Sequence, residues 1–168
     1  MDEIVSFDMR LIRRSLLAAT TVLAIASPAF ADVTAFIGTT ATPSNRAVKG
    51  FGIGAGFVIV AFEFEYADTS EDLSDGAPSL RTGMGNVLLQ TPFAIHGFRP
   101  YFTTGGGLFR ESLGAISETS FAANTGGGVK ISLAGPLRAR VDYRLFRLRG
   151  DPIYETVHRF YAGLNINF

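Results

Sequence analysis

Charged side chains occupy every second position in two stretches of this sequence. In "VAFEFEYA", 60–67, Glu63 and Glu65 alternate with aromatic residues; in "LRARVDYRLF", 137–146, arginines and an aspartate alternate with apolar residues. If such a face lines an enclosed space, its carboxylates and guanidiniums must pair, because an isolated buried charge is very costly. The spacing therefore predicts an ion-pair network in the interior of the protein. Its members are Glu63, Glu65, Arg138, Arg140, Asp142, Arg144 and Arg159, and Lys130 and Asn124 add polar groups.

The two histidines offer little for catalysis. Acyl-transfer chemistry needs a nucleophile, a positioned base and an orienting acid. His96 falls in a predicted turn, and His158 has Val157 and Arg159 as neighbours, with no His-x-Ser pair. The simplest role for His158 is that of an interfacial polar residue. We therefore predict no catalytic residue, no metal site and no cofactor; the run "GFGIGAG" lacks the strand–turn–helix context of a dinucleotide-binding loop.

Alternation with a period of two extends through most of the chain and predicts strands. The expected strands are 33–40, 50–57, 60–67, 81–89, 99–109, 121–133, 137–146 and 157–168. Most are near the 9–11 residues that a tilted transmembrane strand requires. The first, third, fifth and seventh connections are polar and longer: "ATPSNRAVK", "DTSEDLSDGAPSL", "RESLGAISETS" and "RLRGDPIYET". The second and sixth are very short, and the fourth, "TPFAIHGF", is longer than strict alternation predicts.

Alternation alone does not say whether the apolar face points to lipid or, as in a lipocalin-like soluble barrel, to a core. The segment "GFGIGAGF" separates the two, because Gly50, Gly52, Gly54 and Gly56 share one face. Solvent-facing glycines would weaken a strand and gain nothing. Inward glycines would leave room for charged side chains in the narrow interior of an eight-stranded barrel. The glycine face therefore favours a barrel with its apolar side towards lipid.

The aromatic residues are consistent with a lipid-facing surface. We expect most of them on the apolar faces, some in girdles near the strand ends. They are Phe36, Phe51, Phe57, Phe62, Phe64, Tyr66, Phe102, Tyr143, Phe160 and Phe168. The runs "TTGGGLF" and "NTGGGV" leave the facing of 99–109 and 121–133 undetermined.

The first 31 residues are predicted to be a cleaved signal peptide. Three arginines precede a short apolar run, and an A-x-A site ends at Ala31, the pattern of Sec-dependent export. The true start is possibly Met9, since acidic residues precede it. Residues 32–168 then form one domain. The chain has no cysteine, and 15 basic residues balance 15 acidic ones, so neither disulfides nor a general attraction to nucleic acid is indicated.

These features together resemble the small outer-membrane β-barrel family, the group around the OmpA transmembrane domain and the OmpX-like proteins. The resemblance rests on the eight alternating segments, "RPYFTTGGGLFR", "GGGVKISLAGPLRARVDYRLFRL" and the closing "HRFYAGLNINF". It implies an all-β, eight-stranded antiparallel up-and-down transmembrane barrel. It also implies that Phe160, Leu164, Ile166 and Phe168 form the C-terminal signal read by the barrel-assembly machinery. Expected partners are outer-membrane lipid, lipopolysaccharide and periplasmic chaperones, and we expect a monomer that binds no nucleic acid.

The predicted function is that of an integral outer-membrane barrel with a structural or surface-interaction role and a charge-filled, non-conducting lumen. The acidic residues Asp68, Glu71, Asp72 and Asp75 of the second long loop could meet cations, lipopolysaccharide or a host surface, although simple solvation also explains them. A narrow small-solute channel is the alternative. A lipid-modifying enzyme of the outer membrane is a further alternative that the histidines do not favour.

Overall fold

The computed structural model describes residues 30–168, in which the chain forms eight β-strands and no helix. The strands are β1 Phe30–Thr40, β2 Arg46–Gly56, β3 Val60–Thr69, β4 Ser79–Gln90, β5 Phe98–Leu113, β6 Ile116–Ala134, β7 Leu137–Leu148 and β8 Thr156–Asn167. Each overlaps one predicted segment, so the predicted all-β fold is confirmed. Several strands reach further than predicted, because their polar end residues resemble loop residues in composition.

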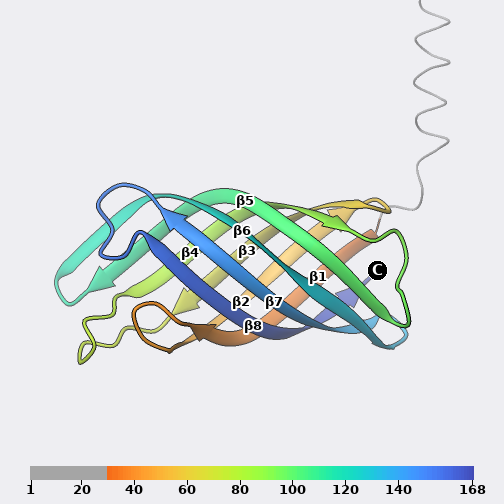
Figure 1. Ribbon diagram of the computed structural model, residues 1–168, viewed down its shortest axis with the longest axis horizontal. Coiled ribbons are helices and arrows are strands. Elements are labelled where there is room, and N and C mark those ends of the chain that lie inside the picture. The colour runs from red at the N-terminus through yellow and green to blue at the C-terminus, as the bar shows by residue number, and fades with distance from the viewer. Residues whose placement is uncertain (1–29) are drawn as a thin grey trace, which may run out of the picture.

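The sheet closes on itself. Each strand pairs antiparallel with the next, and β8 pairs with β1, giving a tilted eight-stranded barrel (Figure 1). The closing register runs from Asp32 opposite Asn167 to Thr40 opposite Arg159. Closure removes every free strand edge, so the backbone hydrogen bonds of the sheet are satisfied within the barrel.

The two ends of the barrel differ. At one end, here called the loop end, the strands are joined by residues 41–45, 70–78, 114–115 and 149–155. At the other, the turn end, they are joined by 57–59, 91–97 and 135–136, and the C-terminus lies there too (Figure 1). The fourth connection, 91–97, is longer than its two neighbours, as its sequence predicts.

The fifth connection contradicts the predicted long loop. Residues 110–120 belong almost entirely to a paired hairpin, in which β5 and β6 continue until Leu113 faces Ile116. Gly114 has φ = +59°, a conformation that glycine adopts without steric cost, and it begins the tight turn. A Gly-Ala pair between two apolar residues is a hairpin signal that the surrounding polar residues obscure. The hairpin projects beyond the neighbouring strands at the loop end (Figure 1).

Side chains alternate between the two sides of the sheet, and the large apolar side chains exposed on the strands lie on its outer side. Phe62 and Leu164 are exposed on the outer surface, whereas Gly52, Gly54 and Gly56 are buried inside. Nine of the ten aromatic residues predicted on the apolar faces are exposed, namely Phe51, Phe57, Phe62, Phe64, Tyr66, Phe102, Tyr143, Phe160 and Phe168. A lipocalin-like barrel would bury this apolar face, so the lipid-facing arrangement is the one observed.

Phe36 is the exception and corrects the prediction. It points into the barrel, is 4% exposed and stacks on Tyr161, with ring centroids 4.0 Å apart. Gly50 lies beside it on β2, where an added Cβ would come within 2.4 Å of the Phe36 ring. Glycine at this position therefore creates the space that lets an aromatic side chain sit inside.

The predicted signal peptide, 1–31, lies outside the described residues except for its last two. Phe30 and Ala31 begin β1, and Ala31 exchanges backbone hydrogen bonds with Phe168. Within residues 30–168 no helix has the length and hydrophobicity needed to cross a membrane.

Candidate functional site: the barrel lumen

Glu63 lies at the centre of a charged network inside the barrel. Its carboxylate accepts hydrogen bonds from both Nη atoms of Arg140 and, at 3.0 Å, from Nη2 of Arg144. Because β3 and β7 lie across the barrel from each other, these contacts span the lumen. All three side chains are almost completely buried. Two guanidiniums on one carboxylate are tolerable in such a place only if further acids supply the missing negative charge.

Asp142 supplies one of those charges from β7 itself. Its carboxylate accepts hydrogen bonds from Nη2 of Arg140 at 3.0 Å and from Nε of Arg144 at 3.1 Å. The Tyr101 hydroxyl donates to Asp142 and accepts a hydrogen bond from Nε of Arg140 at 2.7 Å. The tyrosine thereby links an acid on β7 to β5 without adding a charge.

Glu65 continues the network towards the loop end. It pairs with Nη1 of Arg144 at 3.2 Å and with Nη1 of Arg159 at 3.4 Å, and accepts a hydrogen bond from the Tyr161 hydroxyl at 3.1 Å. Arg159 also donates to Thr82, and its guanidinium carbon lies 4.3 Å from the centroid of the Phe146 ring. Arg159 therefore marks the boundary between the charged and apolar parts of the lumen.

A second ion pair lies nearer the turn end. Lys130 on β6 donates to Asp32 on β1 at 2.5 Å, and both side chains are at most 3% exposed. The buried ion pairs thus join four acids with four bases, so the paired interior is neutral overall. The acids are Asp32, Glu63, Glu65 and Asp142, and the bases are Lys130, Arg140, Arg144 and Arg159.

Arg138, expected in the network, lies apart from it. Its Nη2 donates to Asn167 at 2.8 Å, and the side chain is only part-buried at the turn end. Asn124 points inward, as expected, but donates to Asn86 at 2.8 Å and contacts no charged partner. The strand period predicts which side a residue occupies, whereas its height along the barrel depends on strand tilt and register.

An apolar cluster lines the β4–β8 side of the loop-end half of the lumen. Its seven buried members come from β4 to β8, and they are Leu80, Met84, Phe109, Ala122, Phe146, Leu148 and Val157. Beyond them, the buried guanidinium of Arg46 donates to the carbonyl groups of Thr42 and Pro78. Charged and apolar layers together leave the interior occupied by side chains along its length.

The connections at the loop end are anchored to the β5–β6 hairpin. Glu111 accepts a hydrogen bond from the backbone N–H of Ile153, and Glu118 from that of Asp151, both at 2.7 Å. Glu71 of loop 70–78 accepts from Gly114 N–H at 2.7 Å. These carboxylates hold two neighbouring connections against the hairpin.

Three of the four acids predicted in the second long loop accept hydrogen bonds within the protein, and Glu71 is one of them. Asp68 lies in β3, where it accepts a hydrogen bond from Arg81 at 3.2 Å. The Asp72 carboxylate accepts hydrogen bonds from the Ser74 hydroxyl and from the backbone N–H groups of Ser74 and Asp75. The Ser74 hydroxyl contributes most to lowering the pKa of Asp72 below its ordinary value. The acidic loop therefore has local structure.

Neither histidine lies in a catalytic arrangement. His96 is in connection 91–97 at the turn end, with φ = 51°. His158 faces outward on β8, and its Nδ1 lies 2.9 Å from the Tyr143 hydroxyl. Among residues 30–168 no three His, Cys, Asp or Glu side chains are grouped as a metal site would require.

Three members of the buried network were not identified from the sequence. The predicted network contained no tyrosine and therefore omitted Tyr101 and Tyr161; it also omitted Asp32, which follows the predicted cleavage site directly. The parity of each strand carries a signal for two of them. Tyr161 shares its side of the strand with Arg159, and Asp32 shares its side with Thr34.

The sequence matches no family profile and no curated protein. The fold, however, is similar to solved outer-membrane barrels. Neisserial surface protein A, NspA, has a TM-score of 0.67 at 14% identity, over 84% of this chain and 98% of that chain. The N-terminal β-barrel domain of Pseudomonas aeruginosa OprF has a TM-score of 0.64 at 15% identity, over 83% and 97%. The outer-membrane enzyme PagL has a TM-score of 0.52 at 15% identity, over 80% and 98%.

At these identities the similarity concerns the fold. This chain is an eight-stranded antiparallel barrel of the outer-membrane type, and the resemblance to the small barrels of that class is confirmed at the level of architecture.

Proposed function

We propose that this protein is an integral outer-membrane barrel with a structural or surface-interaction role and a lumen that conducts no solute. The observation that carries the proposal is the occupied interior. Arg140, Arg144 and Arg159 are fully buried inside the barrel at successive levels along its axis. The apolar cluster lies next to them, nearer the loop end. A hydrated ion would have to displace paired charges and then packed apolar side chains, each at a high cost in free energy.

The outer surface supports insertion in a membrane. Exposed Phe, Leu, Ile and Val side chains surround the barrel, a patch far larger than a soluble monomer leaves uncovered. In barrels of this type longer loops face the exterior of the cell and short turns the periplasm. The loop end is accordingly the external end in this proposal.

The external end also offers a surface for partners. Its connections carry three well-exposed apolar side chains, Leu73, Ile116 and Ile153, each on a different connection or hairpin. Glu71, Asp72 and Asp75 add acidic groups on loop 70–78. The anchoring of these connections to the β5–β6 hairpin limits the entropy lost when a partner binds. This combination favours an interaction role over a purely structural one.

Catalysis is not part of the proposed function, although one barrel of similar fold, PagL, is an enzyme. His158 lies beside Tyr143 and has neither a serine nor an acid as partner among its described hydrogen bonds. The small-solute channel is the less favoured alternative, since buried ion pairs and apolar side chains occupy the interior. No cofactor is assigned.

Export and assembly complete the proposal. A Sec signal peptide would be cleaved after Ala31, and periplasmic chaperones would deliver the chain to the barrel-assembly machinery. Phe160, Leu164 and Ile166 lie exposed on the outer side of β8, with Phe168 directly after the strand, where an assembly factor could read them. The barrel has no free edge for pairing with another copy, which supports a monomer.

Cell fractionation with gel electrophoresis tests this function. We expect the protein in the outer-membrane fraction, and we expect its band to shift on boiling, because a folded barrel resists detergent until heated. Recovery in the soluble periplasmic fraction would contradict membrane insertion. A band unchanged by boiling would show that no stable barrel had formed.

A further inference from the structure

Charged side chains on the outer surface of the strands are confined to one end. Outward-facing Lys, Arg, Asp and Glu residues of β1–β8 all lie in the loop-end half, and they are Lys49, Asp68, Arg81, Arg110 and Arg147. Four are cations and one is an acid. Towards the turn end the outward positions of these strands are uncharged. The asymmetry indicates that the loop end meets an environment rich in negative charge.

Four of these residues form a continuous row across adjacent strands. Lys49 on β2 is the register partner of Asp68 on β3, Asp68 of Arg81 on β4, and Arg81 of Arg110 on β5. Strands lie about 4.8 Å apart, so the backbones of Lys49 and Arg110 are roughly 14 Å apart. Because barrel strands tilt, the row runs obliquely around the loop end. It carries a net charge of plus two.

The row contains an unfavourable pair. Arg81 and Arg110 stand directly opposite each other, and like charges in such positions destabilise a sheet. Asp68 lies 3.2 Å from Arg81, whereas no ion pair of residues 30–168 includes Arg110. Lys49 likewise forms no described ion pair. An anion held between the two arginines would remove the repulsion.

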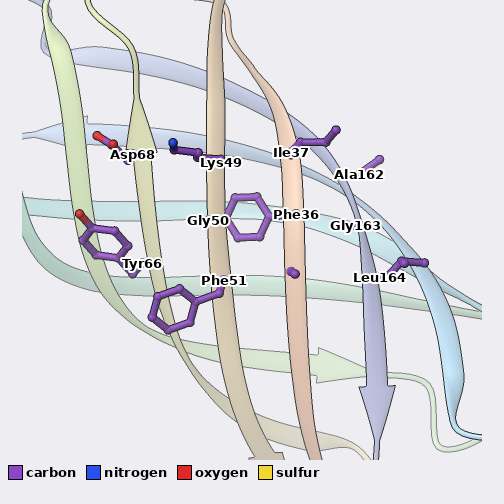
Figure 2. A pocket seen from close by; sticks show the side chains of 11 residues that line it. Phe36, Ile37, Lys49, Gly50, Phe51, Tyr66, Asp68, Ala162, Gly163 and Leu164 are labelled. Atoms are coloured by element: carbon purple, nitrogen blue, oxygen red, sulfur yellow. The ribbon is translucent and has the colours of Figure 1, made fainter.

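An apolar groove begins directly beneath Lys49. It crosses β8, β1, β2 and β3 on the outside of the barrel, is lined by two or three residues of each strand, and has a volume of about 750 Å³ (Figure 2). Small residues, Ala35, Gly50, Ala162 and Gly163, form its floor together with Phe36, and its walls are Ile37 and Leu164 on one side and Phe51 and Tyr66 on the other. Figure 2 shows Lys49 and Asp68 together at one end of it.

Groove and row together fit one kind of molecule. On a lipid-facing surface an apolar groove must be filled by hydrocarbon, since an empty one forfeits dispersion contacts. A cation at its external end would meet the headgroup of the lipid whose chain occupies it. The arginine pair two strands away provides a second anion site at a separate position. The separation between Lys49 and the Arg81–Arg110 pair suits a headgroup with two separated phosphates better than one with a single phosphate.

We propose that this face binds a diphosphorylated, multiply acylated lipid of the lipid A kind. One acyl chain lies in the groove between Leu164 and Phe51, one phosphate contacts Lys49, and the other lies between Arg81 and Arg110. The inference rests on the proposed function in requiring that the protein is inserted in a membrane with its loop end towards the lipid layer that contains such lipids.

Native mass spectrometry of the full-length protein in a zwitterionic detergent tests the inference. The probes are diphosphoryl lipid A, monophosphoryl lipid A and phosphatidylglycerol, each titrated separately. We expect wild-type protein to prefer the diphosphorylated lipid. Arg81→Gln with Arg110→Gln should raise the dissociation constant at least tenfold, and Ala162→Phe should do the same by filling the groove.

Two matched variants serve as controls. Arg147→Gln removes an outward cation of β7 that is not in the row, and Thr104→Phe adds a ring to the outside of β5, away from the groove. Both should stay within twofold of wild type. The inference would be overturned if the double arginine variant and Ala162→Phe bound diphosphoryl lipid A as tightly as the controls do. It would also be overturned if the wild-type protein bound phosphatidylglycerol as tightly as diphosphoryl lipid A. Every sample is first checked for the band shift on boiling, so a protein that never forms a barrel counts against the proposed function instead.

Discussion

The carboxylate of Glu63 is the group that two guanidiniums share, and its removal is the sharpest test of the network. Glu63→Gln keeps the shape of the side chain but leaves Arg140 and Arg144 with less negative charge in a buried site. Removing one partner of a buried pair costs about 3–5 kcal/mol. We expect a loss of that size in the free energy of unfolding, measured by urea titration of the refolded protein in detergent.

The matched control is Asp68→Asn, which breaks the exposed pair with Arg81 in the same way. Exposed pairs contribute only about 0–1 kcal/mol, so this variant should unfold almost as wild type does. Equal effects of the two substitutions would mean that the charges inside the barrel are solvated and that the lumen is not dry.

At the residue scale, the sequence predicts which side of the sheet a side chain occupies more accurately than it predicts the residue with which that side chain pairs. The period of two assigns Glu63, Glu65 and Arg140 to the inside, and the structure brings all three into the network. It assigns Arg138 there as well, although that residue pairs with Asn167 near the turn end. Partners depend on which rows of eight tilted strands meet across the lumen, and this is a property of the shear of the barrel, which no local pattern encodes.

At the element scale, the glycines of β2 provide space for side chains from other strands. A Cβ at Gly50 would meet the Tyr66 carbonyl oxygen at 2.3 Å and the Phe36 ring at 2.4 Å, whereas a Cβ at Gly83 on β4 would meet nothing within 4 Å. Gly50→Ala should therefore cost about 1–3 kcal/mol through overpacking. Gly83→Ala should be neutral or stabilise by up to about 1 kcal/mol, because alanine restricts the unfolded chain. Urea titration of both variants decides this, and an equal response would show that Gly50 has no packing role.

The final strand permits a test of assembly separate from stability. Phe168 is 73% exposed, so Phe168→Ser should lower the free energy of unfolding by only about 1–3 kcal/mol. If the last residues of β8 are the assembly signal, the amount of protein inserted in cells should fall much further. Phe102→Ser, a comparable loss from the outer face of β5, should have a similar effect on stability and leave the yield unchanged. Equal membrane yields for the two variants would reduce Phe168 to a girdle residue.

The β5–β6 hairpin shows where element boundaries escape sequence reasoning. Residues 110–120 are largely polar because the hairpin projects beyond the other strands, and its inward face contacts connection 149–155 through Glu111 and Glu118. In a transmembrane barrel, a polar segment can therefore be either a loop or a strand that extends beyond the membrane. The glycine at position 114, which has a positive φ in the structure, is the residue of the sequence that marks the turn.

At the scale of the whole molecule, the lumen has two barriers in series. The paired charges are neutral overall and join β3 to β7 across the lumen, and the apolar cluster lies on the β4–β8 side of its loop-end half. The charged strand faces and the inward glycines were enough to predict that charged side chains fill the lumen. The apolar cluster was not predicted, because alternation leaves the facing of 99–109 and 121–133 undetermined, and these segments contain Phe109 and Ala122.

The measurement that tests the central claim most directly is the conductance of the pure protein in planar lipid bilayers. Protein used for it is first shown to be folded and inserted by its band shift on boiling and by its retention in proteoliposomes. A barrel whose interior is filled by paired charges and an apolar cluster should give no steady current above the bare membrane. A large, stable conductance from folded protein would contradict the account, because it would require a continuous hydrated path where Arg140, Arg144 and Arg159 now lie buried.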